Sequence, residues 1–402
     1  MRAIILLYEI YHFIEILFAL IFVHIQQLKL KKMRYKVSYI IVLIILLIGF
    51  ISASAQETEK KGLFAGFPEE LTLSGYVDAY IAYDNDKGNS LRQFSVIAPY
   101  RDEFRINMAV LALRYSAKNI RSNIAIQFGD VPKLNWPQAP NEYLQYIQEA
   151  NIGVSPYKNS WIDAGYFLTH IGAEGIIPKY NFFTSVSLCT YYEPIYQSGI
   201  KYSYSGKKFY TSLMLLNGYN VLADNNKNKS FGLQIGYKPN DKADITFNNI
   251  TGNEMPTGTA GKTRIYNNLV IKLFPSKKLD VILCGDFCMQ EKSKIDDAEA
   301  SGSMFSAFAS MKYRASKNVS LMLRGEIFQD KDAVMSPAFM LSDSTFSGLK
   351  AFGVTGGAEF NPTPNSYFRL EGRYLATDAD EKIFYEQKNN RFEVILSGGI
   401  EF

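Results

Sequence analysis

Apolar and polar residues alternate one by one along most of this chain, and this alternation constrains the fold more than any other feature. In "YFRLEGRYL", residues 367–375, phenylalanine, leucine, glycine and tyrosine alternate with two arginines and a glutamate. Segments 71–84 and 279–290 show the same period. Because the side chains of a strand point alternately to its two faces, each segment predicts a strand with one apolar and one polar face.

The boundaries between these segments are of two kinds, which alternate along the chain. Seven are short polar turns, such as "SAKN" at 116–119 and "NPTPN" at 361–365. The other eight are longer: 85–102, 131–144, 170–195, 219–229, 253–263, 292–302, 330–348 and 378–390. This alternation counts sixteen strands, and an even number places both chain ends on the side of the short turns.

The pattern therefore predicts an all-β fold, a transmembrane antiparallel up-and-down β-barrel of about 16 strands. Short periplasmic turns and longer external loops are typical of such barrels. The number would be 18 if residues 182–190 formed a further strand together with an unseen partner. A β-propeller would repeat a blade motif every ~40–45 residues, and the sequence contains no such repeat.

Aromatic residues support a sheet whose outer face meets lipid. Phe, Tyr and Trp make up 14% of the chain. They recur beside the short turns, where a membrane barrel carries an interfacial girdle. These aromatics are Tyr115, Tyr157, Tyr204, Tyr237, Phe274, Tyr313, Phe360 and Phe368.

The end of the chain, "FEVILSGGIEF", continues the alternation to the last residue. We expect residues 391–402 to form the strand that closes the barrel against the first one. A terminal aromatic with apolar residues at every second position before it is typical of outer-membrane proteins, whose assembly machinery reads it. Phe402, Ile400 and Leu396 are the candidates for this signal.

The first 70 residues precede the predicted barrel at 71–402. Residues 33–55 have a basic start, a short apolar run and "ASA" at the end, which are the parts of a secretory signal peptide. Residues 1–32 are an upstream extension or the result of a misplaced start, and 56–70 are a short periplasmic segment. Six of the 43 Lys and Arg and two of the 39 Asp and Glu lie within residues 1–55, so 37 of each sign remain. A neutral body predicts no nucleic-acid partner.

Five segments between residues 71 and 275 carry a resemblance to a known family. They are "LSGYVDAYIAYD", "RDEFRINMAVLALRY", "WIDAGYFLTHIGAEG", "YQSGIKYSYSG" and "LLNGYN". The chain resembles the OmpL-like outer-membrane β-barrel porins of Gram-negative bacteria of the Bacteroides type. The resemblance implies a passive channel for small hydrophilic solutes in the outer membrane, in contact with lipid and lipopolysaccharide. It names no solute and leaves open whether the protein is a monomer or a homo-trimer.

Charged residues on the polar strand faces are the candidates for lining the pore. A charge on the lipid face costs ~2–4 kcal/mol near the bilayer midplane, so we expect these side chains to point inward. They either neutralise one another or set up a transverse field that steers anions. The candidates are Asp78, Arg105, Arg121, Arg324, Glu326, Arg369, Glu371, Arg373 and Arg391.

The third long stretch, 170–195, is the longest and is the candidate for narrowing the channel. In general porins the third external loop folds into the barrel, and we expect the same here by analogy. A barrel of sixteen strands is wide enough to enclose an aqueous channel. The residues expected near the constriction are Glu174, Lys179, Asn181 and Glu193.

No motif for catalysis, a cofactor or a metal ion stands out. His170 is the only histidine beyond residue 55, and no nucleophile motif accompanies it. Cys284 and Cys288 lie on one strand face, too far apart for a disulfide and without the spacing of common zinc sites; Cys189 is the third cysteine. We therefore predict a diffusion porin and no enzyme. Two alternatives stay open, a non-conducting structural or adhesive barrel and an outer-membrane enzyme that uses His170.

Overall fold

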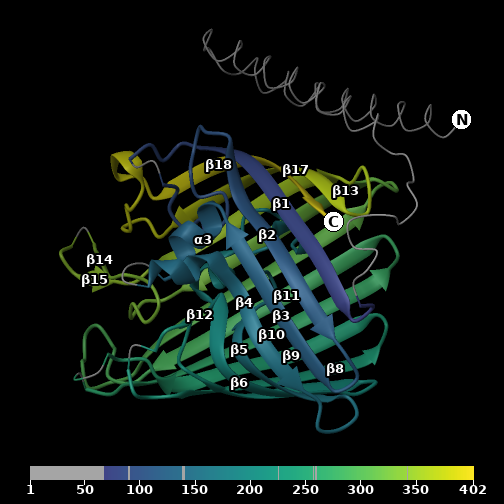
Figure 1. Ribbon diagram of the computed structural model, residues 1–402. Coiled ribbons are helices and arrows are strands. Elements are labelled where there is room, and N and C mark those ends of the chain that lie inside the picture. Colours follow the sequence, from purple (N-terminus) through teal and green to yellow (C-terminus); the bar gives the residue numbers. More distant parts are fainter. Residues whose placement is uncertain are drawn as a thin grey trace, which may run out of the picture. The chain divides into compact units, whose positions relative to one another are not determined.

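The computed structural model describes residues 68–88, 91–137, 141–224, 226–256, 258, 260–341 and 343–402. The predicted extension, the signal peptide and most of the segment 56–70 lie outside these residues. The described part of the chain forms a closed antiparallel β-barrel of sixteen strands, as the alternation predicts (Figure 1). No helix among the described residues is long and apolar enough to cross a membrane.

The strands of the barrel follow one another around the ring in chain order. They are β1 (Leu71–Asp84), β2 (Arg105–Ser116), β3 (Ile120–Phe128), β4 (Ile147–Val154), β5 (Ser160–Leu168), β6 (Tyr196–Ser205), β7 (Phe209–Leu216), β8 (Ser230–Asn240), β9 (Ala243–Asn253), β10 (Thr263–Ser276), β11 (Leu279–Gln290), β12 (Gly302–Arg314), β13 (Val319–Gln329), β16 (Lys350–Phe360), β17 (Ser366–Thr377) and β18 (Asn390–Glu401).

Short elements lie in the connections between these strands. They are α3 (Asp130–Asn135), η1 (Glu142–Tyr146), η2 (Pro178–Tyr180), α4 (Leu188–Tyr192), η3 (Tyr385–Gln387) and the small hairpin of β14 (Phe339–Met340) and β15 (Phe346–Ser347). Segment 182–190 contains no strand and leads into α4, so the alternative of eighteen strands is not adopted. The strand count and the alternation of short turns with long loops are as expected.

The barrel closes where β18 pairs with β1, with Val77 opposite Ile400. The last residue extends this seam, because Gly75 N donates to Phe402 O at 2.7 Å and Phe402 N donates to Gly75 O at 2.9 Å. The Phe402 ring lies over Gly75, where an added Cβ would come within 2.4 Å of the ring. Closure satisfies backbone groups that would otherwise face lipid unpaired.

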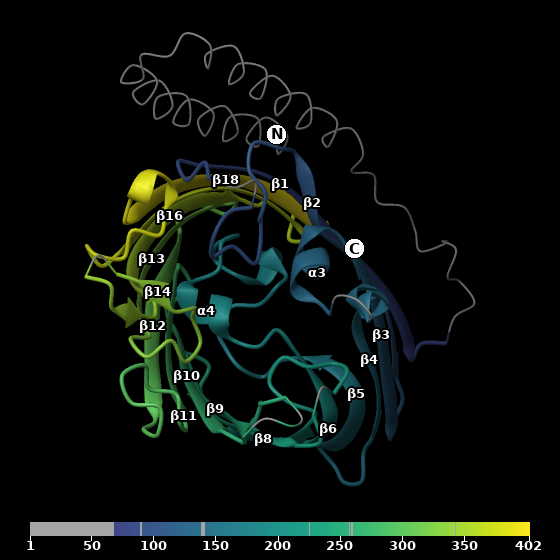
Figure 2. The ribbon, with the colours of Figure 1, turned by 90° about the vertical axis from the view of Figure 1, so that its left-hand side faces the viewer.

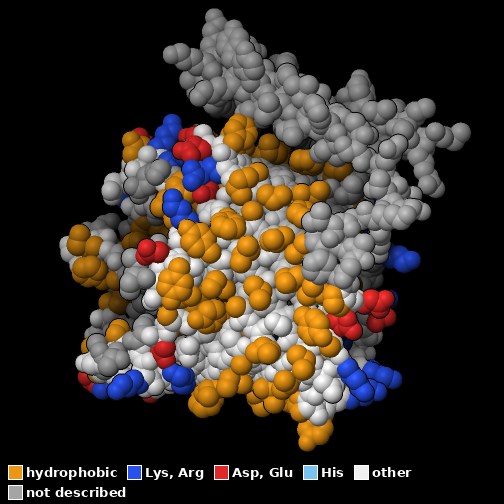
Figure 3. All heavy atoms as spheres, viewed as in Figure 1, with side chains coloured by type: hydrophobic (Ala, Val, Ile, Leu, Met, Phe, Trp, Pro, Cys, Tyr) orange, Lys and Arg blue, Asp and Glu red, His pale blue; other side chains and the backbone are white. Residues whose placement is uncertain are grey.

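The outer and inner faces of the strands differ as the alternation requires. On β13, Leu321, Leu323 and Ile327 are exposed on the outside, whereas Arg324 and Glu326 are buried inside. Figure 3 shows many hydrophobic side chains on the side of the barrel that faces the viewer. Of the predicted girdle aromatics, Phe360 is buried and Phe368 half-buried; Tyr115, Tyr157, Tyr204, Tyr237, Phe274 and Tyr313 are exposed.

Candidate functional site

Residues 169–195, which connect β5 to β6, fold into the barrel and are called the inward loop. Figure 2 shows α4 of this loop inside the ring of strands. Around the closed ring, β13, β16, β17 and β18 lie on the side away from β5 and β6, and these four strands are called the far wall. The hydrogen bonds described below join the loop to this wall, so the loop crosses the lumen.

Two arginines of the far wall donate hydrogen bonds to the backbone of the inward loop. Arg324, on β13, donates to Ser185 O at 2.7 Å and pairs with Glu174 of the loop at 2.8 Å. Arg369, on β17, donates to Asn181 O at 3.1 Å. The carbonyl groups of an irregular segment away from water need such donors. The arginines therefore determine where the loop can lie.

Two carboxylates of the same wall accept hydrogen bonds from the loop. Glu371, on β17, accepts from the backbone N–H groups of Thr184 at 2.6 Å and Ser185 at 2.7 Å. Glu326, on β13, accepts from the backbone N–H of Leu188 at 2.7 Å. Donors and acceptors of the loop backbone are thus both matched by charged groups of the wall.

The charges of the far wall also neutralise one another. Arg373 donates to both oxygens of Glu326 at 2.9 and 2.8 Å, and Arg369 donates to Glu359 at 3.1 and 2.5 Å. Close pairing offsets the high desolvation cost of buried charges. The predicted pore-lining residues Arg324, Glu326, Arg369, Glu371 and Arg373 are all at most 4% exposed. They point inward, but the structure places them in a neutral network beneath the inward loop and not at an open water surface.

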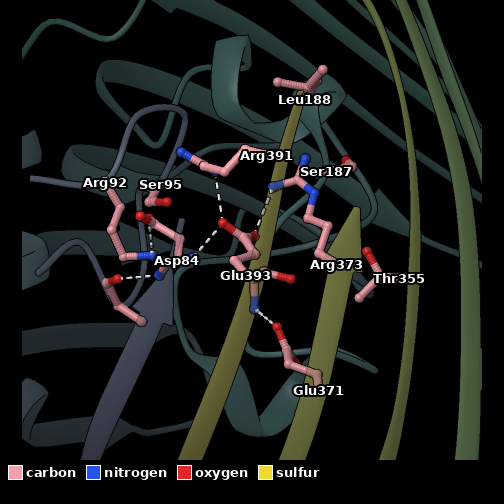
Figure 4. A network of polar contacts seen from close by, with 12 residues as sticks. Asp84, Arg92, Ser95, Ser187, Leu188, Thr355, Glu371, Arg373, Arg391 and Glu393 are labelled. Atoms are coloured by element: carbon pink, nitrogen blue, oxygen red, sulfur yellow. Dashed lines mark hydrogen bonds and ion pairs between the residues drawn. The ribbon is translucent and has the colours of Figure 1, made fainter. Parts of the chain in front are cut away.

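A second buried network joins the first long loop, residues 85–104, to β18 (Figure 4). Arg92 contacts Asp84 at 3.2 Å and Glu393 at 2.5 Å, and Arg391 contacts Glu393 at 2.7 Å. Arg391, another predicted pore-lining residue, is fully buried here. Sequence reasoning missed Arg92, because it lies in a loop where no periodicity marks its direction.

Asp78 and Arg105, the predicted pore-lining residues near the seam, also form hydrogen bonds with neighbouring side chains. Asp78 is 1% exposed and accepts a hydrogen bond from Asn107 Nδ2 at 2.8 Å. Arg105 donates through Nε and Nη2 to the two oxygens of Asp130, on α3, at 2.7 Å each. Arg105 therefore holds α3 at the end of β2 where the long loops begin.

The four residues expected at the constriction all lie on the inward loop, but the polar groups of three of them bind neighbours. Glu174 pairs with an arginine of the far wall, as described, and Lys179 pairs with Glu401 at the end of β18. Asn181 Nδ2 donates to the backbone O of Gly175 at 2.6 Å, and Asn181 Oδ1 accepts from the N–H of Gly175 at 2.8 Å. Glu193 is 5% exposed.

The inner face of β2 to β10, called the near wall, differs from the far wall because some of its charged side chains stay exposed. Arg121 pairs with Asp163 at 2.5 Å, yet its side chain is 35% exposed. A recess of about 280 Å³ on this wall is lined by polar groups, among them Arg114, Asn123 and Lys201. Polar side chains that keep contact with solvent are the ones that a diffusing solute can meet.

Basic residues predominate on the near wall. Strands β2 to β10 carry seven basic and three acidic residues, whereas the four strands of the far wall carry five of each. The near-wall set comprises Arg105, Arg114, Arg121, Lys201, Lys238, Arg264 and Lys272 against Glu149, Asp163 and Asp244. Sequence reasoning named only Arg105 and Arg121 of these, because it could not tell which inward charges the loop would cover.

His170 lies at the start of the inward loop and contacts the sheet backbone. Its Nε2 lies 3.1 Å from Asn249 O, which makes Nε2 the protonated nitrogen of the neutral ring. Desolvation lowers the pKa of the imidazole to about 4. Among the described residues, the His170 ring forms no hydrogen bond with a hydroxyl, thiol or carboxylate side chain. The contact anchors the loop to β9.

A closed barrel with an apolar outer face, charged interior and inward-folded third loop defines an outer-membrane barrel of the porin class. Residues 70–402 match the family described as "Putative beta-barrel porin-2, OmpL-like". The chain belongs to this family, and it is located in the outer membrane. No curated protein matches its sequence significantly.

Solved outer-membrane proteins share the fold at low sequence identity. The channel DcaP of Acinetobacter baumannii aligns with a TM-score of 0.55 at 12% identity, over 83% of this chain and 97% of that one. An anion-selective porin from Comamonas acidovorans aligns with a TM-score of 0.54 at 11% identity, over 83% and 99%. OmpT of Vibrio cholerae aligns with a TM-score of 0.54 at 12% identity, over 83% and 97%.

Proposed function

We propose that this protein is a passive diffusion channel for small hydrophilic solutes, with a preference for anions. The observation that carries the proposal is the contrast between the two walls of the lumen. The inward loop seals the neutral far wall, while the near wall keeps exposed polar side chains, and its strands carry four more basic than acidic residues. Solutes therefore pass between the inward loop and the near wall.

The surplus of positive charge acts on solutes by electrostatic focusing. Charges that line a narrow water-filled path with low-dielectric walls raise the local concentration of counter-ions. Arg114, Lys201 and Lys272 face the lumen from three different strands. Anions are thus attracted along the path without a specific binding site, which suits diffusion of many small solutes.

The test is single-channel recording of the folded barrel in a planar bilayer under a potassium chloride gradient. We expect stable open steps and a zero-current potential that reports more chloride than potassium passing. Replacing Lys201 and Lys272 by Gln should move this potential toward equal permeability. Lys292→Gln is the control, because Lys292 lies in an external loop with its side chain 53% exposed.

Absence of conductance from a correctly folded barrel would reject the channel and favour the structural or adhesive barrel. The enzyme alternative depends on His170, which is neutral and contacts backbone. We infer further that the protein meets lipid, lipopolysaccharide and the outer-membrane assembly machinery. A homo-trimer is the assembly we propose; one solved OmpT structure with this fold is described as a trimer form, with a TM-score of 0.52.

A further inference from the structure

Four buried side chains with metal-binding groups meet where α4 packs against the barrel wall. Cys189 and Glu193 come from the inward loop, and Cys284 and Asp286 come from β11. One sulfur or oxygen atom from each lies within 4.8 Å of those of the other three. All four residues are at most 5% exposed.

Local structure explains why these residues converge. Cys189 and Glu193 are four residues apart on one helical turn, so their side chains project on the same side. Cys284 and Asp286 are two residues apart on a strand, so both face the lumen. Ser187 caps α4 by accepting a hydrogen bond from Thr190 N at 3.2 Å, which fixes the turn.

Neighbouring polar groups hold the four donors in place. Cys189 Sγ lies 2.7 Å from Asp286 Oδ2, and Ser306 Oγ donates to the same oxygen at 3.1 Å. Asn268 Nδ2 donates to Asp286 Oδ1 at 2.7 Å and lies 3.2 Å from Cys284 Sγ. Outer groups of this kind orient the ligands in metal sites.

Glu193 supplies a second, independent observation that points to a cation. Its Oε1 lies 3.9 Å from Cys284 Sγ and 3.3 Å from Asn268 Nδ2. Its other oxygen, Oε2, is buried without a hydrogen-bond partner. A buried carboxylate oxygen with no partner is costly in an interior that excludes water.

The charge balance of this cluster differs from that of the far wall. Glu326, Glu359 and Glu393 are each within ion-pair distance of an arginine. Among the described residues, no lysine or arginine forms an ion pair with Glu193 or Asp286. The cluster therefore holds two buried carboxylates and two thiols without a compensating positive charge.

We propose that Cys189, Glu193, Cys284 and Asp286 bind one zinc ion. Thiolates select zinc over calcium and magnesium, and four ligands of this kind suit its tetrahedral coordination. Ideal zinc ligands lie about 3.3–3.8 Å apart, so the farthest donors need to move inward by less than about 1 Å each, while Cys189 Sγ and Asp286 Oδ2 need to move apart. Binding releases the two thiol protons to solvent, and the resulting thiolates bind the metal.

The metal would tie the inward loop to β11, next to the residue that binds Glu326 of the far wall, Leu188. The loop would then be held to β11 as well as to the far wall, and its place in the lumen would depend on zinc. The assignment does not require the protein to conduct, because metal content is measured without reference to transport. Cys189 and Cys284 are both free thiols in the structure.

The experiment is metal analysis of the full folded protein, purified in detergent without reductant or chelator. We expect one zinc per chain by mass spectrometry. After zinc is removed, added cobalt should produce the near-ultraviolet absorption of a cobalt–thiolate bond. Cys284→Ser and Asp286→Asn should each lose the metal. Cys288→Ser is the matched control, because Cys288 is buried on the same face of the same strand outside the donor set.

Heat-dependent migration on a gel verifies folding of each variant. Asp286→Asn keeps the assignment testable by cobalt titration if Cys284→Ser fails to fold. The proposal is overturned if the folded protein binds neither zinc nor cobalt, or if Cys284→Ser and Cys288→Ser bind equally. It is equally overturned if mass measurement shows that two of the three thiols are joined in a disulfide.

Discussion

At the scale of single residues, the buried charges of the far wall are stabilised by the groups next to them. Each buried arginine of the far wall lies next to a carboxylate, and each buried carboxylate next to an arginine or a loop N–H, as the contacts of Arg373 and Glu371 illustrate. The alternation predicts which charged side chains point into the barrel. It does not predict which of them are buried, because burial depends on what packs over each side chain.

The seam of the barrel gives a first prediction at this scale. Gly75→Ala places a methyl group against the Phe402 ring and should destabilise the closed barrel by about 1–3 kcal/mol, the usual range for overpacking. Urea unfolding in detergent measures it. Gly325→Ala is the matched control, because a Cβ there meets nothing within 4 Å. Equal stability of the two variants would show that the ring does not need the glycine.

His170 gives a second prediction, on pH dependence. Its folded-state pKa of about 4 lies below the ordinary value of about 6.5, so the unfolded chain binds the proton more readily. Stability from the neutral ring is therefore present above pH ~6.5 and falls as the pH drops toward ~4. The loss is on the order of 1–3 kcal/mol.

The measurement is urea unfolding at several pH values for wild type and His170→Gln. The difference in stability between the two should change across this window, because the glutamine does not titrate. A constant difference would mean that the pKa of the imidazole is the same in the folded and unfolded protein. Since His170 is the only histidine beyond residue 55, no second ring obscures the comparison.

At the scale of elements, the inward loop is held both by charges of the wall and by its own buried apolar side chains, among them Phe183 and Leu188. Glu371 accepts two backbone N–H groups of the loop, from Thr184 and Ser185. The loop contains only short helical turns, η2 and α4. Its position therefore follows from side chains of other strands.

Glu371→Ala should release this part of the loop. It leaves two buried N–H groups unpaired, at a cost of about 1–3 kcal/mol each, so the loop should shift toward water. We expect noisier and larger single-channel currents than in wild type. Glu299→Gln, in an external loop with its side chain 82% exposed, should change nothing. Unchanged currents in Glu371→Ala would show that the loop is held elsewhere.

At the scale of the whole molecule, the ring of strands and the inward loop are two distinct parts of the structure. The sixteen strands pair through backbone hydrogen bonds, and none of these strands lies within the inward loop. The electrostatics of the lumen are divided in the same way, with a neutral far wall and a basic near wall.

Replacing residues 176–186 by a short Gly-Ser linker should therefore leave the barrel folded and raise its conductance. The physical reason is that the replaced segment occupies lumen space without pairing in the sheet. Heat-dependent gel migration measures folding, and bilayer recording measures conductance. The same linker in place of residues 294–299, in an external loop, is the control. A barrel that no longer folds would mean that assembly needs the loop.

Much of the fold could be predicted from the sequence because the signals are local. A period of two depends only on neighbouring residues. A few consecutive positions therefore predict the strands, the turns and whether a side chain such as Arg369 or Leu323 points into or out of the barrel. The same holds for the ending at Phe402, whose alternation continues to the last residue.

Which residues meet inside the lumen depends on the tertiary structure. Arg324 meets Ser185 across 139 positions, and Cys189 meets Asp286 across 97. No local pattern encodes such pairs, because the loop between β5 and β6 has no period and its path is set by groups on distant strands. The sequence by itself determined that a charged interior exists; only the folded chain decided which charges are covered, and which four donors meet around one point.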